Sequence, residues 1–153
     1  MNIAKPFAAN LYSSGQPSAD DLAQFAADGV RTVINLRAAA EPVEYDEARE
    51  VERRGMRYVA IPIAGATDLT PDTVARFSQE LEQARTHGAV LLHCASGNRV
   101  GALVALDAGL TRGETAAQAV SLGRAAGLTG LEAVVAGLLA DAQGTVASKA
   151  PFN

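Results

Sequence analysis

Residues 89–106, AVLLHCASGNRVGALVAL, combine a short apolar run, a loop of small residues and a second apolar run with helical spacing. The run at 89–93 predicts a buried β-strand, and the residues after the loop predict a helix that begins near Arg99 and runs through 100–110. A strand, a loop and a helix in this order are typical of α/β proteins, in which ligands bind beyond the carboxyl ends of the strands. Cys94 therefore lies at the edge where we expect a functional site.

The loop from Cys94 to Arg99 has the composition of an anion-binding loop. Small residues and Gly97 allow successive backbone N–H groups to point inward, and a following helix adds its positive N-terminal end. Arg99 supplies a guanidinium fork. The same field favours the thiolate form of Cys94, so we expect a nucleophile that faces a bound oxyanion. The alternative is that Cys94 is a small apolar residue at the end of a core strand.

The rest of the chain alternates between short apolar runs and segments with helical spacing. Runs at 11–13, 31–35 and 57–62 predict three more strands, and helices are predicted at 18–27, 44–54, 71–86, 114–126 and 131–142. This alternation predicts an α/β fold with a central, mostly parallel sheet of about four to five strands flanked by helices. The length predicts a single domain, 1–153, with a frayed tail at 147–153.

Composition narrows the functional classes. A formal net charge of -4 without a basic stripe argues against nucleic acid as a partner. The single cysteine excludes an intramolecular disulfide, and we find no apolar segment long enough for a signal peptide or a membrane span. We therefore expect a cytoplasmic protein that does not bind membranes.

The quoted motifs resemble the cysteine-dependent protein tyrosine phosphatase superfamily, in particular small dual-specificity-like bacterial proteins related to a domain associated with β-lactamase-like hydrolases. The resemblance covers most of residues 10–110, with LYSSGQPS at 11–18, RTVINLR at 31–37, RYVAIPIAGATDLTP at 57–71 and HCASGNRVGAL at 93–103. It implies a dual-specificity-phosphatase-like fold and hydrolysis of phosphoric monoesters through a phosphocysteine, without a cofactor. The implied partner is a phosphorylated small molecule or a phosphoprotein.

The resemblance also assigns roles to residues. It implies that Cys94 is the nucleophile, that Arg99 grips the phosphate oxygens and that Asp68 is the general acid. The alternative for Asp68 is a carboxylate that only favours the helix N-terminus after it, and Asp72 is a weaker candidate because it lies inside that helix. The implied phosphate-binding loop comprises Ala95, Ser96, Gly97, Asn98, Arg99 and Val100.

Three further residues lie close to these motifs. His93 is expected to be a supporting residue, hydrogen-bonded beneath the loop. A metal site is not expected, because the other histidine, His87, has no ligand-like neighbours. Gln16 and Arg37 are expected to belong to the scaffold, as a turn residue and a surface charge at a strand end. The alternative is that they reach toward the loop after Cys94.

Two features depart from the phosphatase pattern. Four residues separate Cys94 from Arg99, where phosphatases have five, and Val100 stands where they usually carry Ser or Thr. The shorter spacing resembles that of rhodanese-like sulfurtransferases, whose loops often read Cys-x-x-Gly-x-Arg and hold a persulfide. Sulfurtransfer through a Cys94 persulfide is therefore an alternative function, and a non-catalytic module that binds an anion or a partner is a second one. The substrate and the oligomeric state stay open.

Overall fold

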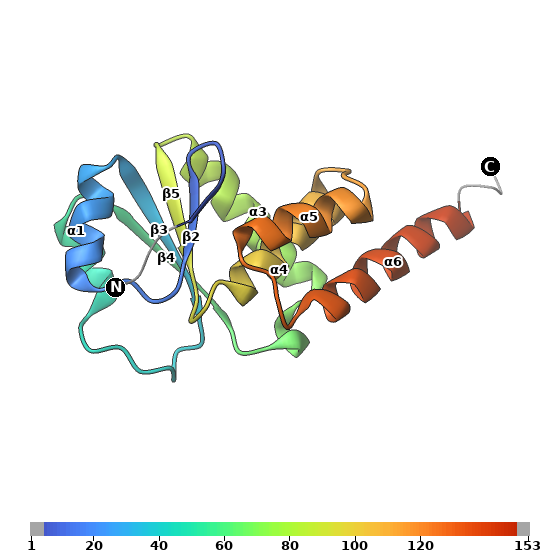
Figure 1. The fold of residues 1–153 in the computed structure, drawn as a ribbon, viewed down its shortest axis with the longest axis horizontal. Helices are drawn as coiled ribbons and strands as arrows, with labels where there is room; N and C mark the ends of the chain where they lie inside the picture. Colours follow the sequence, from blue (N-terminus) through green and yellow to red (C-terminus); the bar gives the residue numbers. More distant parts are fainter. Residues whose placement is uncertain (1–4, 150–153) are drawn as a thin grey trace.

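A five-stranded sheet with the strand order β1-β2-β5-β3-β4 forms the centre of the computed structural model, which describes residues 5–149 (Figure 1). Its strands are β1 (Lys5–Ala8), β2 (Leu11–Ser14), β3 (Val30–Arg37), β4 (Arg57–Ile63) and β5 (Ala89–His93). Strand β1 pairs antiparallel with β2, and the other neighbouring strands are parallel. The predicted α/β fold with a mostly parallel sheet is confirmed.

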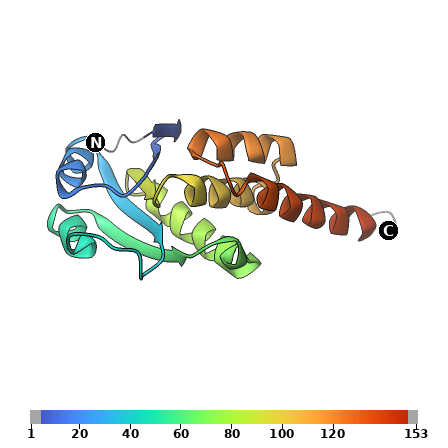
Figure 2. The same ribbon diagram turned by 60° about the horizontal axis from the view of Figure 1, so that its bottom comes forward.

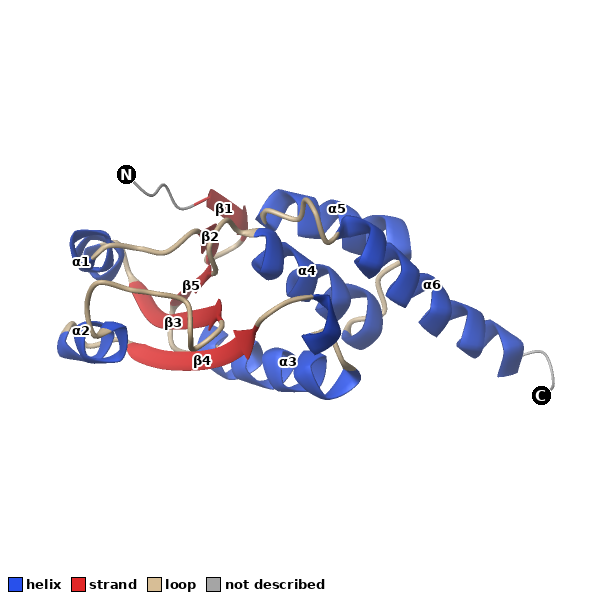
Figure 3. Cartoon of the chain, turned by 90° about the horizontal axis from the view of Figure 1, so that it is seen from below, coloured by secondary structure: helices blue, strands red, loops and turns tan. Residues whose placement is uncertain are grey.

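Helices cover both faces of this sheet. They are α1 (Ala19–Ala27), α2 (Glu47–Arg53), α3 (Pro71–Arg85), α4 (Asn98–Leu106), α5 (Ala116–Ala126) and α6 (Glu132–Lys149). Helices α1 and α2 lie on one side of the sheet, and α3 and α4 lie on the other, where α5 and α6 pack against α4 (Figures 2 and 3). A single π-helical turn, Asp107–Thr111, prolongs α4. In the described part of the chain, no helix is both long and apolar enough to cross a membrane.

Capping residues explain where several predicted helices begin. Ser18 and Asp21 form a capping box at α1, and Thr115 starts a second one at α5. At α3 the Thr70 side chain accepts from the third helical N–H, and Pro71 occupies the first helical position. These local interactions are readable from the sequence, so the starts of these helices lie within two residues of the prediction.

Other boundaries differ from the prediction. The edge strand β1 was not predicted, because KPFA is short and mostly exposed and carries no alternating pattern. Helix α4 starts at Asn98, one residue before the predicted start near Arg99, because Gly97 takes a left-handed conformation and ends the loop. Helix α6 includes residues 147–149, which were assigned to a frayed tail, and the rest of that tail lies outside the described residues.

The alternation of side chains along β5 divides its residues between two cores. Val90 and Leu92 point toward α3 and α4, and Cys94 belongs to the same apolar cluster. Leu91 belongs to the smaller cluster against α1 and α2, and His93 follows it on that side of the sheet. Consecutive residues at the end of β5 therefore reach opposite faces at the carboxyl edge of the sheet.

Candidate active site

Cys94 lies just beyond the end of β5, and its side chain is fully buried. Its backbone N–H donates to the carbonyl of Ser14 (3.2 Å), which fixes the start of the loop to β2. Its Sγ accepts a hydrogen bond from the backbone N–H of Gly97 (3.0 Å). Gly97 has a φ of 93°, a conformation that strongly favours glycine, and it precedes α4 directly. The loop therefore turns back over the sulfur and points a backbone N–H group at it.

The predicted phosphate-binding loop, residues 95–100, spans the turn after Cys94 and the start of α4. Ala95 and Ser96 are exposed in the loop, but Asn98, Arg99 and Val100 form the first turn of α4. The reason is the left-handed residue before them, which starts the helix before the arginine. Val100 is fully buried in the large core cluster, so the position after the arginine contributes packing. No described side chain caps this end of α4.

The connection between α5 and α6 supports the back of this first turn. The Asn98 Oδ1 accepts from the backbone N–H groups of Thr129 (2.9 Å) and Leu131 (3.2 Å). The Asn98 side chain therefore binds the connection between α5 and α6, on the side away from the Cys94 loop. One turn further, Gly101 packs against the same segment so closely that a Cβ would lie 2.2 Å from the Leu128 backbone nitrogen. The helices beyond residue 110 thus fix the orientation of α4 and of the arginine that it carries.

Arg99 is held by a carboxylate that the sequence analysis did not identify. Its Nη1 and Nη2 donate to the Oε2 (2.5 Å) and Oε1 (2.8 Å) of Glu41, and Nη1 also donates to the carbonyl of Ile63 (2.7 Å). The bond to Arg99 lowers the pKa of Glu41 from 4.5 to about 2, although burial opposes it. The bond to Glu41 raises the pKa of Arg99, and the nearby Cys94 sulfur raises it further. These three bonds use three of the five guanidinium N–H groups.

Asp68 lies at the end of a short 3-10 helix, Ala66–Asp68, between β4 and α3. Its Oδ2 accepts from the backbone N–H of Ala64 (2.7 Å), so the carboxylate closes its own loop. This loop directly follows Ile63, whose carbonyl binds Arg99. The structure therefore brings the loop of Asp68 to the arginine, but no hydrogen bond among the described residues joins Asp68 to Cys94. The weaker candidate, Asp72, is exposed in the first turn of α3.

His93 is fully buried, and its Nε2 lies 2.5 Å from the Oε2 of Glu47, at the start of α2. The other carboxylate oxygen accepts from the Gln16 Nε2 (2.8 Å), and Arg37 donates in turn to the Gln16 Oε1. The side chain of Arg37 is only 11% exposed. The expectation of a turn residue and a surface charge was therefore wrong, and the alternative describes them better: both side chains join a network that leads to His93, the residue before Cys94.

The two carboxylates in this arrangement, Glu41 and Glu47, carried no local signal in the sequence. Glu41 lies in the loop after β3, and Glu47 opens a charged helix, where an acidic residue is ordinary. Their partners lie 58 and 46 residues further along the chain. Among the described residues, no group of three or more His, Cys, Asp or Glu side chains is arranged to hold a metal ion.

Curated relatives carry the name beta-lactamase hydrolase-like protein. The chain is 38% identical over 101 residues to the protein of Xylella fastidiosa (strain Temecula1), a match that covers 63% of this chain and 23% of that protein. It is 32% identical over 104 residues to the protein of Agrobacterium fabrum (strain C58), covering 65% of this chain and 23% of the relative. The chain thus spans about a quarter of the length of these relatives.

Solved phosphatase structures share the fold. The active form of Tk-PTP superposes with a TM-score of 0.72 at 24% identity, covering 90% of this chain and 96% of that one. TpbA of P. aeruginosa, solved in complex with pTyr, gives a TM-score of 0.65 at 22% identity, covering 79% and 71%. The family model that describes a DSP-PTPase phosphatase fused to NAD+ kinase matches residues 2–134. The chain therefore belongs to this family of dual-specificity-like tyrosine phosphatases.

Proposed function

We propose that this chain hydrolyses phosphoric monoesters through a phosphocysteine intermediate on Cys94. The observation that carries the proposal is the arrangement at the carboxyl edge of the sheet. A buried sulfur receives a backbone N–H, and an arginine from the following turn of helix lies beside it. A thiolate with an oxyanion clamp in this position is suited to attack phosphorus and to stabilise the equatorial oxygens.

The first chemical step forms the S–P bond and breaks the P–O bond to the alcohol. The Cys94 thiolate attacks the phosphorus, Arg99 and the loop amides bind the phosphoryl oxygens, and Asp68 gives its proton to the leaving oxygen. In the second step water attacks the phosphocysteine, Asp68 takes a proton from that water, and the thiolate leaves. For Asp68 to act, its carboxylate has to exchange the bond to the Ala64 N–H for one to the substrate.

The buried Val100 predicts which step limits the rate. In the family that the sequence resembles, the residue after the arginine usually carries a hydroxyl that helps the thiolate leave. Val100 has no such group and is enclosed in the core. We therefore expect the phosphocysteine to form faster than it is hydrolysed, with a burst of alcohol release before the steady state.

The proposed substrate is a phosphorylated small molecule or a phosphoprotein. TpbA has been solved with pTyr, and we extend to this chain only the chemical class, a phosphoric monoester. The short spacer, which leaves the loop with few residues before α4 starts at Asn98, favours sulfurtransfer as the second candidate, because a persulfide sulfur is smaller than a phosphoryl group.

The test is to assay the purified chain with an aryl phosphate and, separately, with thiosulfate and cyanide. Cys94→Ser and Asp68→Asn are assayed beside it, and Asp72→Asn is the matched control for the acid. We expect aryl phosphate hydrolysis that is abolished by Cys94→Ser, falls about 10²-fold or more with Asp68→Asn and persists with Asp72→Asn. Thiocyanate formation that is lost only with Cys94→Ser would replace the proposal with sulfurtransfer, and no turnover in either assay would favour a binding module.

A further inference from the structure

The signature segment HCASGNR has a buried or partly buried contact with a carboxylate at each end. At its start, the fully buried His93 contacts Glu47, whose side chain is 4% exposed. At its end, Arg99 forms the two-pronged pair with Glu41. A buried carboxylate is stable only when its oxygens have further hydrogen-bond partners, so the surroundings of Glu47 decide what this contact can do.

One chain of side-chain contacts joins these two ends. The Gln16 Nε2 donates to the Oε1 of Glu47 (2.8 Å), and its Oε1 accepts from Arg37. The Nε of Arg37 then lies 3.4 Å from the Oε1 of Glu41, the carboxylate that holds Arg99. In order, this contact network consists of His93, Glu47, Gln16, Arg37, Glu41 and Arg99.

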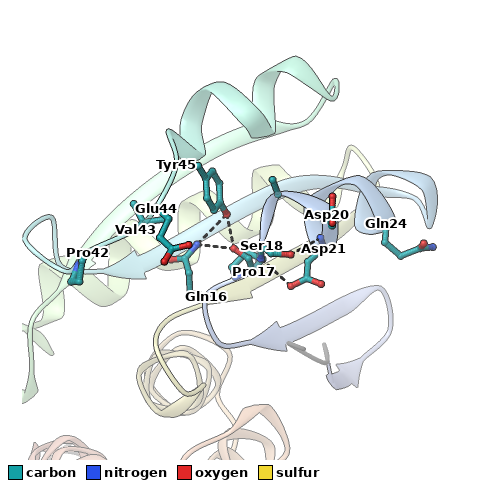
Figure 4. Close-up of a pocket in the computed structure, with 11 residues that line it drawn as sticks. Gln16, Pro17, Ser18, Asp20, Asp21, Gln24, Pro42, Val43, Glu44 and Tyr45 are labelled. Carbon is teal, nitrogen blue, oxygen red and sulfur yellow. Dashed lines mark hydrogen bonds between the residues drawn. The ribbon is translucent and has the colours of Figure 1, made fainter.

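Gln16 is well placed to act as the link, because it lies where two loops meet. Its Nε2 also contacts the Tyr45 hydroxyl (3.2 Å), and that hydroxyl donates to the Pro17 carbonyl (2.5 Å), as Figure 4 shows. The loop after β2 is thereby tied to the loop between β3 and α2. Burial raises the pKa of Tyr45 to about 12, so this hydroxyl keeps its proton at neutral pH. The amide orientation of Gln16 is therefore fixed on several sides.

A second observation sets His93 apart from an ordinary core histidine. Its Nδ1 is buried and has no hydrogen-bond partner among the described residues. A buried polar atom without a partner is costly, and such departures from full hydrogen bonding are concentrated at functional sites. The ring belongs to the residue that directly precedes Cys94, so its orientation bears on the backbone where the loop starts.

We propose that Glu47 is a positioning residue for the reaction at Cys94, and that Gln16 and Arg37 couple it to Arg99. This inference rests on the proposed function. Glu47 accepts from the Nε2–H of His93, which fixes the tautomer and the plane of the ring. The rest of the contact network fixes the Arg99 guanidinium at the other end of the same seven-residue segment. The nucleophile and the clamp are then held in register, and a misplacement of about 1 Å between such groups can cost about 10²-fold in rate.

The test uses Glu47→Gln, with Glu52→Gln on the exposed side of the same helix as the control. In Glu47→Gln the new amide can still accept from His93. Its NH₂ group then faces the NH₂ group of Gln16, so the contact network is interrupted between residues 47 and 16. We expect kcat for an aryl phosphate to fall about 10-fold or more, measured well below the unfolding temperature, with a smaller change in KM. The control is expected to keep wild-type kcat.

The double variant Gln16→Glu/Glu47→Gln separates positioning from packing. It exchanges amide and carboxylate, so the amide at 47 donates to the carboxylate at 16, which still accepts from Arg37. We expect it to recover most of the kcat that Glu47→Gln loses. Should Glu47→Gln fail to fold, Gln16→Ala is the second variant. It removes the half-buried side chain in the middle of the contact network and is expected to lower kcat in the same way.

The outcomes separate this inference from the function on which it rests. An active wild type whose hydrolysis requires Cys94, together with wild-type kcat in folded Glu47→Gln and Gln16→Ala, would overturn the positioning role alone. A loss of kcat that the double variant does not recover, with the fold intact, would overturn the coupling through Gln16. A wild type without Cys94-dependent hydrolysis would overturn the proposed function and this inference with it.

Discussion

Replacing Glu41 by Gln removes the negative charge from the pair with Arg99 and keeps the size of the side chain. The pair is two-pronged, and its side chains are 14% (Arg99) and 27% (Glu41) exposed, so it is neither a free surface pair nor a fully buried one. The lowering of the pKa of Glu41 from 4.5 to about 2 corresponds to a stabilisation of at most about 3 kcal/mol at neutral pH. Because solvent screens a partly exposed pair, we expect Glu41→Gln to lower the free energy of unfolding by about 1–3 kcal/mol.

The pH dependence gives this prediction its sharpest form. A carboxyl group whose pKa is lowered on folding stabilises the protein above its ordinary pKa, and this stabilisation is lost as the pH falls toward the folded value. For Glu41 the loss begins near pH 4.5 and is largely complete near pH 2, and at pH 3 about 40% of the neutral-pH effect remains. The difference in stability between wild type and Glu41→Gln is therefore expected to shrink between pH 7 and pH 3.

Urea unfolding followed by circular dichroism at both pH values measures this difference. The matched control is Glu44→Gln, an exposed glutamate in the same loop, for which we expect a change within about 0.5 kcal/mol at either pH. The same protein preparations report on function: with Arg99 held less firmly, KM for an aryl phosphate is expected to rise. An equal stability difference at pH 7 and pH 3, or no difference at either, would refute the interpretation of Glu41 as the carboxylate that holds the arginine.

Three other substitutions probe the remaining parts of the site. Val100→Thr adds a buried hydroxyl, so we expect a faster steady state after the burst in stopped-flow assays. We also expect the free energy of unfolding in urea to fall by about 1–3 kcal/mol. An unchanged burst would contradict the proposed rate-limiting step. Gly101→Ala places a Cβ 2.2 Å from the Leu128 backbone nitrogen, so thermal unfolding should show severe destabilisation, and an unaltered Tm would contradict the close packing of α4. Asn98→Ala leaves two backbone N–H groups before α6 without their acceptor. We therefore expect the free energy of unfolding to fall by about 1–2 kcal/mol and amide hydrogen exchange at these groups to become faster. Unchanged exchange would show that the contact is dispensable.

The sequence predicts those parts of the site that depend on neighbouring residues. Cys94 and Arg99 are brought together by a strand, a tight loop and a helix, and each of these has a local pattern: the apolar run before His93, the glycine at 97 and the helical spacing after it. Local pattern also predicts the parallel sheet, because strands that alternate with capped helices leave few other arrangements.

The parts that were missed depend on contacts between distant residues. Nothing near Glu41 or Glu47 indicates that one pairs with the arginine and the other with the histidine, because a loop glutamate and a helix-start glutamate are both common. Arg37 was assigned to the surface on its position at a strand end, but the loop after β3 folds back over it and covers it. The start of α4 at Asn98 depends on one left-handed glycine, whose conformation a sequence permits without specifying it.

The central claim is that Cys94 forms a covalent phosphocysteine, and the most direct measurement is to trap it. The wild-type chain is mixed with an aryl phosphate, quenched in acid within the burst and analysed by peptide mass spectrometry. We predict the mass of one added phosphoryl group on the peptide that contains Cys94, in an amount that matches the burst, and none in Cys94→Ser. Steady aryl phosphate hydrolysis with no phosphoryl group on that peptide, or undiminished hydrolysis by Cys94→Ser, would contradict the account.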